Sequence, residues 1–162
     1  MQEELTDPRG TGRAGERVAP GTALRLRVTR GPLPDEALDA VGTTYGTVDR
    51  RYASRGFCRE MFNGNPFGYS WHAFIHDGKT AVGHYAVIPV RARAGESIVT
   101  AGRGEALFLE ETCRAARLEG ADGPTPAGIA LMAAVHERAL AEGAQILHNR
   151  TSPEIGMIQR MQ

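Results

Sequence analysis

A predicted β-hairpin in the middle of the chain constrains the fold more than any other feature of the sequence. Residues 69–76 are rich in aromatic side chains and alternate in polarity, which is typical of a strand with one buried face. The turn falls on residues 77–79, where an Asp-Gly pair supplies the backbone conformations that short hairpin turns require. Residues 80–93 then form a longer apolar strand, with Pro89 at an irregularity or on an edge. The sequence therefore predicts a sheet at the centre of the domain.

Further strands and helices are predicted on either side of the hairpin. Residues 24–28 alternate in polarity like a strand, and Gly31 and Pro32 end it. Small and apolar residues recur at three- and four-residue steps over 126–142, which predicts a helix with one apolar face. The other predicted elements are helices at 34–42, at 47–62 and from Ser152, a strand that begins near Ser97 and is most apolar at 106–109, and a short strand at 144–148.

The order of these elements is strand, two helices, three strands, helix, strand, helix. That order predicts an α/β (mixed α+β) layer architecture in one domain that covers residues 23–162. Residues 1–22 contain glycine, proline and charged residues but almost no large apolar ones. Because such a segment buries too little surface to offset its loss of conformational entropy, we expect a disordered tail there.

Charge and cysteine content argue against several classes of function. Lys and Arg together number 19 and Asp and Glu also number 19, so no net charge attracts nucleic acid or an anionic membrane. Cys58 and Cys113 are far apart and lack the spacing of a metal site, which indicates a reducing compartment. The polar N-terminus does not resemble a signal peptide, and no apolar run approaches the ~20 residues that span a bilayer. We therefore expect a cytoplasmic protein that binds neither nucleic acid nor membrane.

Three segments carry a resemblance to a known family. Residues 80–90 resemble a third strand in which G-x-x-V-G-x-x-x-x-x-P is common, and residues 65–69 are similar to a segment that precedes this hairpin in some relatives. Residues 123–142, followed by 146–149, are similar to a loop, helix and strand that hold the pyrophosphate of acyl-CoA. The family is the GNAT superfamily of acyl-CoA-dependent N-acetyltransferases. The resemblance implies a GNAT-like central mixed sheet flanked by helices.

The resemblance also implies an activity. GNAT enzymes transfer an acetyl group from acetyl-CoA to a primary amine, by direct attack of the amine in a ternary complex. The acceptor implied here is a small-molecule or peptide amine. Acetyl-CoA would be a cosubstrate.

The start of the 126–142 helix is where the resemblance puts acetyl-CoA. The family's Arg/Gln-x-x-Gly-x-Gly/Ala motif matches at Gly128 and Ala130, with Thr125 in place of Arg or Gln. Free N–H groups at a helix N-terminus bind a pyrophosphate, and small residues let it approach the backbone. Asn149 is expected either to hydrogen-bond the pantetheine arm or to satisfy loop backbone. The expected amide donors belong to Gly128, Ile129, Ala130 and Leu131.

The family's base is often a glutamate on the central strand, and the candidates here are Glu105, Glu110 and Glu111. Strand alternation puts Glu105 and Glu111 on one face and Glu110 on the other, unless a bulge intervenes. Glu105 is the preferred base because it begins the apolar stretch of the strand, and Glu110 is the second candidate. Each glutamate also fits an ordinary solvated carboxylate on a strand.

Histidine and cysteine side chains are assigned to packing. His72 and His76 are expected on one face of a strand, with His84 across the hairpin, but no carboxylate or cysteine completes a set of metal ligands. We therefore expect no metal site. Cys113 lies in no nucleophile motif and is expected to be reduced and half-buried.

The end of the chain departs from the family pattern. Ile158 takes the position of the tyrosine that is often the family's general acid. The alternative function is therefore a catalytically impaired GNAT-like domain that binds acyl-CoA or a protein partner. The resemblance also implies two further strands after the last helix, so we expect the chain to stop before the fold is complete. The strand at 144–149 then becomes an exposed edge, which either pairs into a homo-oligomer or leaves the chain marginally stable.

Overall fold

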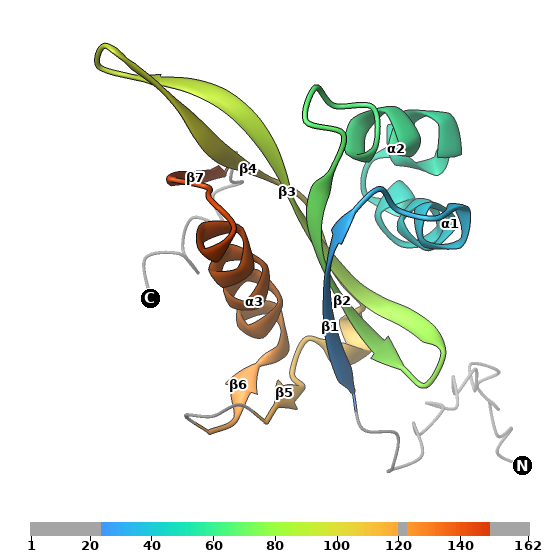
Figure 1. Cartoon of the computed structure of the whole chain (residues 1–162). Coiled ribbons are helices and arrows are strands. Elements are labelled where there is room, and N and C mark those ends of the chain that lie inside the picture. The colour runs from blue at the N-terminus through green and yellow to red at the C-terminus, as the bar shows by residue number, and fades with distance from the viewer. Residues whose placement is uncertain (1–23, 120–122, 150–162) are drawn as a thin grey trace, which may run out of the picture.

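The computed structural model describes residues 24–119 and 123–149 of the chain (Figure 1). Five strands form one sheet in the order β1-β2-β3-β4-β7. The first four strands are antiparallel to their neighbours and β7 is parallel to β4, so the sheet is mixed, as the resemblance implies. The strands are β1 (Arg25–Gly31), β2 (Ser70–Asp77), β3 (Thr80–Ala94), β4 (Ser97–Leu109) and β7 (Ile146–Asn149).

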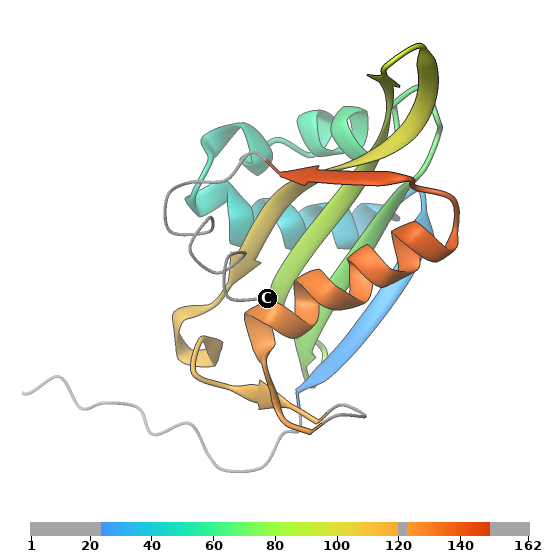
Figure 2. The ribbon, with the colours of Figure 1, turned by 90° about the vertical axis from the view of Figure 1, so that its left-hand side faces the viewer.

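Helices cover both faces of this sheet. In Figure 2, α3 lies in front of the sheet and α1 behind it. The helix α2 lies on the same side as α1 (Figure 1). The helices predicted at 34–42 and 126–142 are confirmed. The observed bounds are α1 (Asp35–Thr44), α2 (Arg55–Phe62) and α3 (Ala127–Ala141).

A second, two-stranded sheet lies in the connection between β4 and α3. It consists of β5 (Arg117–Leu118) and β6 (Thr125–Pro126), which pair antiparallel, where the sequence predicted only a loop. A short 3-10 helix, η3 (Glu111–Cys113), precedes β5. The predicted disordered tail and the helix expected from Ser152 lie outside the described residues.

The single helix predicted over 47–62 is wrong. Asp49 and Ser54 interrupt it, because their side chains accept hydrogen bonds from backbone N–H groups two and three residues further on. Such caps begin a new helical turn instead of continuing the previous one. Tyr52 lies between the two caps and is almost fully buried. The stretch therefore forms two 3-10 helices before α2, namely η1 (Tyr45–Thr47) and η2 (Arg50–Ala53).

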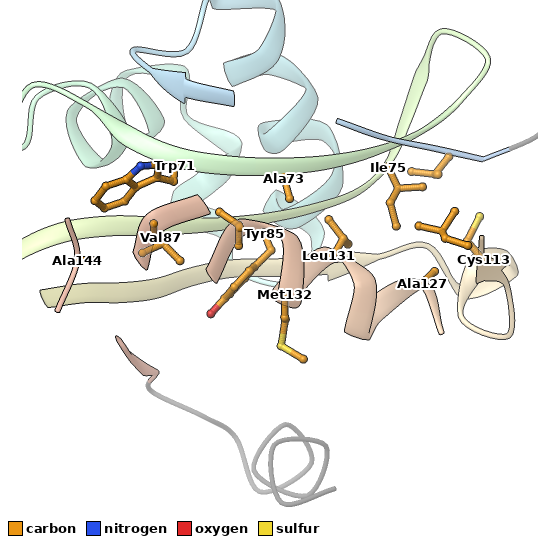
Figure 3. Close-up of a cluster of buried hydrophobic side chains, with 14 residues drawn as sticks. Trp71, Ala73, Ile75, Tyr85, Val87, Cys113, Ala127, Leu131, Met132 and Ala144 are labelled. Atoms are coloured by element: carbon orange, nitrogen blue, oxygen red, sulfur yellow. The ribbon is translucent and has the colours of Figure 1, made fainter. Parts of the chain in front are cut away.

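Two apolar clusters pack against the two faces of the sheet. On the α3 face, Trp71, Tyr85 and Leu131 belong to a cluster that joins β2 and β3 to α3 (Figure 3). On the opposite face, Phe62 and Ile88 belong to a cluster that joins α1, α2 and η2 to the sheet. Burial of an apolar side chain of this size stabilises a fold by ~1.5–3 kcal/mol. The clusters hold β3 and β4 in place, and the candidate site lies in the middle of β4.

The strand β4 is irregular in its middle. Within the described residues, it pairs with β7 only from Ala101 to Gly104. The register against β3 shifts just beyond this point, where Glu105 lies opposite Ala86. Ala106 has a φ of 54°, in the left-handed region that residues other than glycine rarely adopt. The strand therefore bulges where its pairing with β7 ends.

Pro89 lies on an edge of the sheet. The sequence predicted either an irregularity or an edge at this residue. The pairing of β3 with β2 ends at Val87, so Pro89 has a strand partner only on the β4 side, where it lies opposite Gly102. Prolines within sheets are confined to such edge positions, where a backbone N–H is not needed for the ladder.

Candidate active site

Glu105 lies at the bulge of β4, on the face that α1 and α2 cover. One of its carboxylate oxygens accepts a hydrogen bond of 2.7 Å from the hydroxyl of Tyr52. The other lies 3.6 Å from Nε of Arg103, which is two residues earlier on the same face. About a quarter of the Glu105 side chain is exposed, at 26%. The carboxylate is therefore held in a fixed orientation and remains accessible.

Tyr52 is the second member of this arrangement, and no sequence pattern predicted it. Its ring contacts Tyr45 edge-on, with ring centroids 4.8 Å apart. Burial, followed by the hydrogen bond to Glu105, raises the pKa of Tyr52 above its ordinary value. The phenol thus keeps its proton throughout the physiological range and remains a donor to the carboxylate. A pattern search misses the contact because its two partners are 53 positions apart.

The edge of β4 that faces β7 is open beyond the bulge. Among the described residues, no strand pairs with this edge from Glu105 to Leu109. Backbone N–H and C=O groups on such an edge are available to an extended ligand, which can bind as an added strand does. Leu109, at the end of the edge, lies beside the first turn of α3, since a Cβ added to Gly128 would be 3.9 Å from Leu109 Cδ2.

The first turn of α3 contains three of the four residues predicted as backbone donors, Gly128, Ile129 and Ala130. Pro126 is the N-cap and makes no side-chain capping bond. The N–H of Ala127 is already bonded to the carbonyl of Ala116, at 2.9 Å. Gly128 and Ile129 come next, in the part of a helix where N–H groups lack acceptors within the helix. Their amides and the positive end of the helix dipole suit an anion.

The other predicted cofactor residues have different surroundings. Thr125 belongs to β6, and its hydroxyl donates to the carbonyl of Gly123 at 3.4 Å. Ala130 is in the first turn. Leu131 is the fifth helical residue and is completely buried, and its N–H is within reach of the helix's own carbonyls. Asn149 ends β7 opposite Gly104.

Glu110 and Glu111 do not join Glu105. The strand β4 ends at Leu109, and Glu111 lies in η3 with its side chain exposed. Glu105 and Glu111 were expected on one strand face only if no bulge intervened, and a bulge and the end of the strand separate them. Glu110 follows the strand directly, and its backbone N–H donates to the carbonyl of Val82 at 2.9 Å.

Two of the histidines form a buried pair. Nδ1 of His72 lies 3.2 Å from Nε2 of His84, and both rings contact Phe62. Burial lowers the pKa of His84 to about 3 and also lowers the pKa of His72, so both rings are neutral. Across the described parts of the chain, no group of three or more His, Cys, Asp or Glu side chains could hold a metal ion.

A cavity of ~290 Å³ lies between α2 and the strands β3 and β4. Arg103 forms part of its wall and links it to the Glu105 carboxylate. The remaining wall is mostly apolar and consists of Phe57, Glu60, Met61, Asn65, Pro66, Ile88, Pro89 and Val90.

Solved structures of acetyltransferases have the same fold. A Trypanosoma brucei acetyltransferase matches with a TM-score of 0.55 at 15% identity, covering 85% of this chain and 90% of its own. Glucosamine-6-phosphate N-acetyltransferase from Arabidopsis thaliana matches with a TM-score of 0.54 at 12% identity, covering 83% and 89%. An aminoglycoside N-acetyltransferase solved with CoA matches with a TM-score of 0.56 at 13% identity, covering 89% and 88%.

These similarities show that the chain has the fold of the GCN5-related N-acetyltransferases. No protein-family model and no curated protein matches its sequence. No helix among the described residues is long and apolar enough to cross a membrane.

Proposed function

We propose that the protein is an acyl-CoA-dependent N-acyltransferase that transfers an acetyl group from acetyl-CoA to a primary amine. The observation that carries this proposal is the open edge of β4 between the start of α3 and the bulge at Glu105. The edge joins a helix N-terminus, whose amides suit an anion, to a fixed, accessible carboxylate. The fold it shares with solved acetyltransferases supports the same conclusion.

The dimensions of the edge suit the cofactor. From Leu109 to Glu105 the strand spans four residue steps, or ~13 Å at the usual rise of a strand. A pyrophosphate on the amides of Gly128 and Ile129 would begin this track. The amide groups of the pantetheine arm would pair with the backbone of β4 along it, and the thioester would reach the bulge beside Glu105.

The reaction then requires a base for the amine and a source of a proton for the thiolate. Glu105 removes a proton from the ammonium of the acceptor, and the free amine attacks the thioester carbonyl carbon. A C–N bond forms, the C–S bond breaks and the electron pair leaves on sulfur. The second amine proton is lost and the thiolate is protonated through solvent, so the products are an amide and CoA thiol, with one proton released.

The decisive test combines titration calorimetry with acetyl-CoA and a thiol-release assay over a panel of primary amines. Binding together with amine-dependent thiol release is the expected result. Binding without thiol release for any amine would contradict an enzyme and support an acyl-CoA-binding domain. A folded protein that does not bind acetyl-CoA would overturn both functions.

A further inference from the structure

The guanidinium of Arg103 has hydrogen-bonding capacity that the described residues do not use. Its Nε atom is buried and has no hydrogen-bond partner. The nearest carboxylate oxygen, on Glu105, is 3.6 Å from that atom, too far for a good hydrogen bond. One terminal nitrogen donates to the thioether sulfur of Met61 at 3.3 Å, and a thioether is a weak acceptor. The Arg103 side chain is 35% exposed, so its under-used guanidinium is accessible to a ligand, and such a cation favours an anionic one.

The cavity beside Arg103 indicates what the rest of that ligand resembles. Phe57, Met61, Ile88 and Val90 give it apolar walls, and its volume of ~290 Å³ suits a small organic molecule. Glu60 is the acidic side chain that lines it, which disfavours a second negative charge in the ligand. An acceptor for this cavity therefore has an apolar body and one carboxylate.

We propose that the amine acceptor is an apolar α-amino acid. Its carboxylate would bind Arg103, its ammonium would bind Glu105, and its side chain would fill the apolar cavity. An α-amino acid carries both charged groups on one carbon, which matches an arginine and a glutamate that are two residues apart on one strand face. This inference rests on the proposed function, because it takes the amine that Glu105 binds to be the one that accepts the acetyl group.

Direct binding tests the inference without relying on turnover. We expect L-leucine to bind the CoA-saturated protein at least tenfold more tightly than L-leucinamide, which lacks the carboxylate. Arg103→Gln should reduce this ratio to about one, since a charged hydrogen bond of this type is worth ~1.5–3 kcal/mol. Arg91→Gln is the matched control, because Arg91 is an exposed arginine on the neighbouring strand. Equal binding of the two probes to the wild type would overturn the inference.

A second variant keeps the test valid if Arg103→Gln does not fold. Val90→Trp fills the cavity, and it should weaken L-leucine more than tenfold while glycine binding changes less than twofold. An unchanged affinity for L-leucine would overturn the inference. The two proposals also fail separately. Thiol release with other amines, while L-leucine neither binds nor reacts, rejects the amino acid and keeps the N-acyltransferase. Preferential L-leucine binding without thiol release for any amine rejects the N-acyltransferase and keeps the binding site for an apolar α-amino acid.

Discussion

Glu105 combines two properties that a general base needs, a fixed position and access to the ligand. Replacing it with Gln keeps the shape of the side chain and an acceptor for the Tyr52 hydroxyl, but removes the proton acceptor. We expect Glu105→Gln to lower kcat ~100-fold, the lower end of the range for general-base catalysis. Glu111→Gln, on the exposed η3, should leave kcat unchanged. Thiol-release rates for both variants measure the change in kcat. A Glu105→Gln rate equal to that of the wild type would exclude Glu105 as the base and favour Glu110.

Gly102 is a residue whose lack of a side chain the packing requires. A Cβ at this position would lie 2.5 Å from Cγ1 of Val87 and 2.6 Å from Cδ2 of Leu147. We expect Gly102→Ala to lower the free energy of unfolding by ~1–3 kcal/mol, the usual effect of overpacking.

Gly56 provides the contrast for that variant. It lies in α2, and a Cβ there would meet only Ser54 Oγ, at 3.6 Å. Gly56→Ala should raise the free energy of unfolding by up to ~1 kcal/mol, because alanine loses less backbone entropy in a helix. Urea unfolding of the two variants measures the difference. Equal effects would mean that β3, β4 and β7 pack less tightly around Gly102 than the structure indicates.

At the scale of an element, the first turn of α3 carries the proposed phosphate site. A side chain on Gly128 has room in the protein, since a Cβ there is in ordinary contact with Leu109. A branched side chain would instead crowd a ligand on the amides of the turn. We expect Gly128→Val to weaken acetyl-CoA binding more than tenfold, or ~1.4 kcal/mol.

Calorimetry measures this change against a matched variant. Ala133→Val places the same branched side chain on an exposed position of the same helix and should bind acetyl-CoA like the wild type. A folded Gly128→Val protein with unchanged affinity would exclude this turn as the phosphate site.

The elements differ in how far the sequence predicts them. The hairpin and α3 have strong periodicity and clear turn residues, so local pattern was sufficient to predict them. The break in the expected 47–62 helix depends on two side chains, Asp49 and Ser54, that compete with the backbone for hydrogen bonds, and a count of apolar residues does not detect it. The candidate site also combines a feature that local sequence indicates with one that it does not. Glu105 could be selected from its strand, whereas its contact with Tyr52 exists only after two distant elements pack together.

At the scale of the whole molecule, the buried pair of His72 and His84 links stability to pH. The groups around the pair are aromatic rings, Phe62 and Phe74, and the backbone of Ala106, and no charged side chain of the described residues compensates a proton there. Because burial lowers both pKa values in the folded state, the unfolded chain binds more protons in acid. The stability is complete above the unfolded pKa of about 6.5 and falls as the pH decreases toward 3.

We expect each histidine to add ~1.4 kcal/mol per pH unit to this loss between about pH 5 and 6. The carboxylates of Asp35 and Asp49 do not contribute in this range, because neighbouring arginines lower their pKa values below 3.8. Urea unfolding at several pH values gives the slope. His84→Phe should reduce it, and substitution of the exposed His148 by Gln should not. An identical slope in the His84→Phe protein would show that the pair does not titrate on unfolding.

The cavity at Arg103 and the open edge of β4 lie on opposite sides of Glu105 along one strand. Arg103 lies on the cavity side, and Leu109 lies at the far end of the edge. Neither proposed ligand would therefore cover the entrance of the other, and the two substrates should add in random order. Initial-rate plots against both concentrations should give intersecting lines, and a non-reactive analogue of the amine should inhibit competitively against the amine and non-competitively against acetyl-CoA. A strictly ordered pattern would mean that one ligand first has to create the binding site of the other.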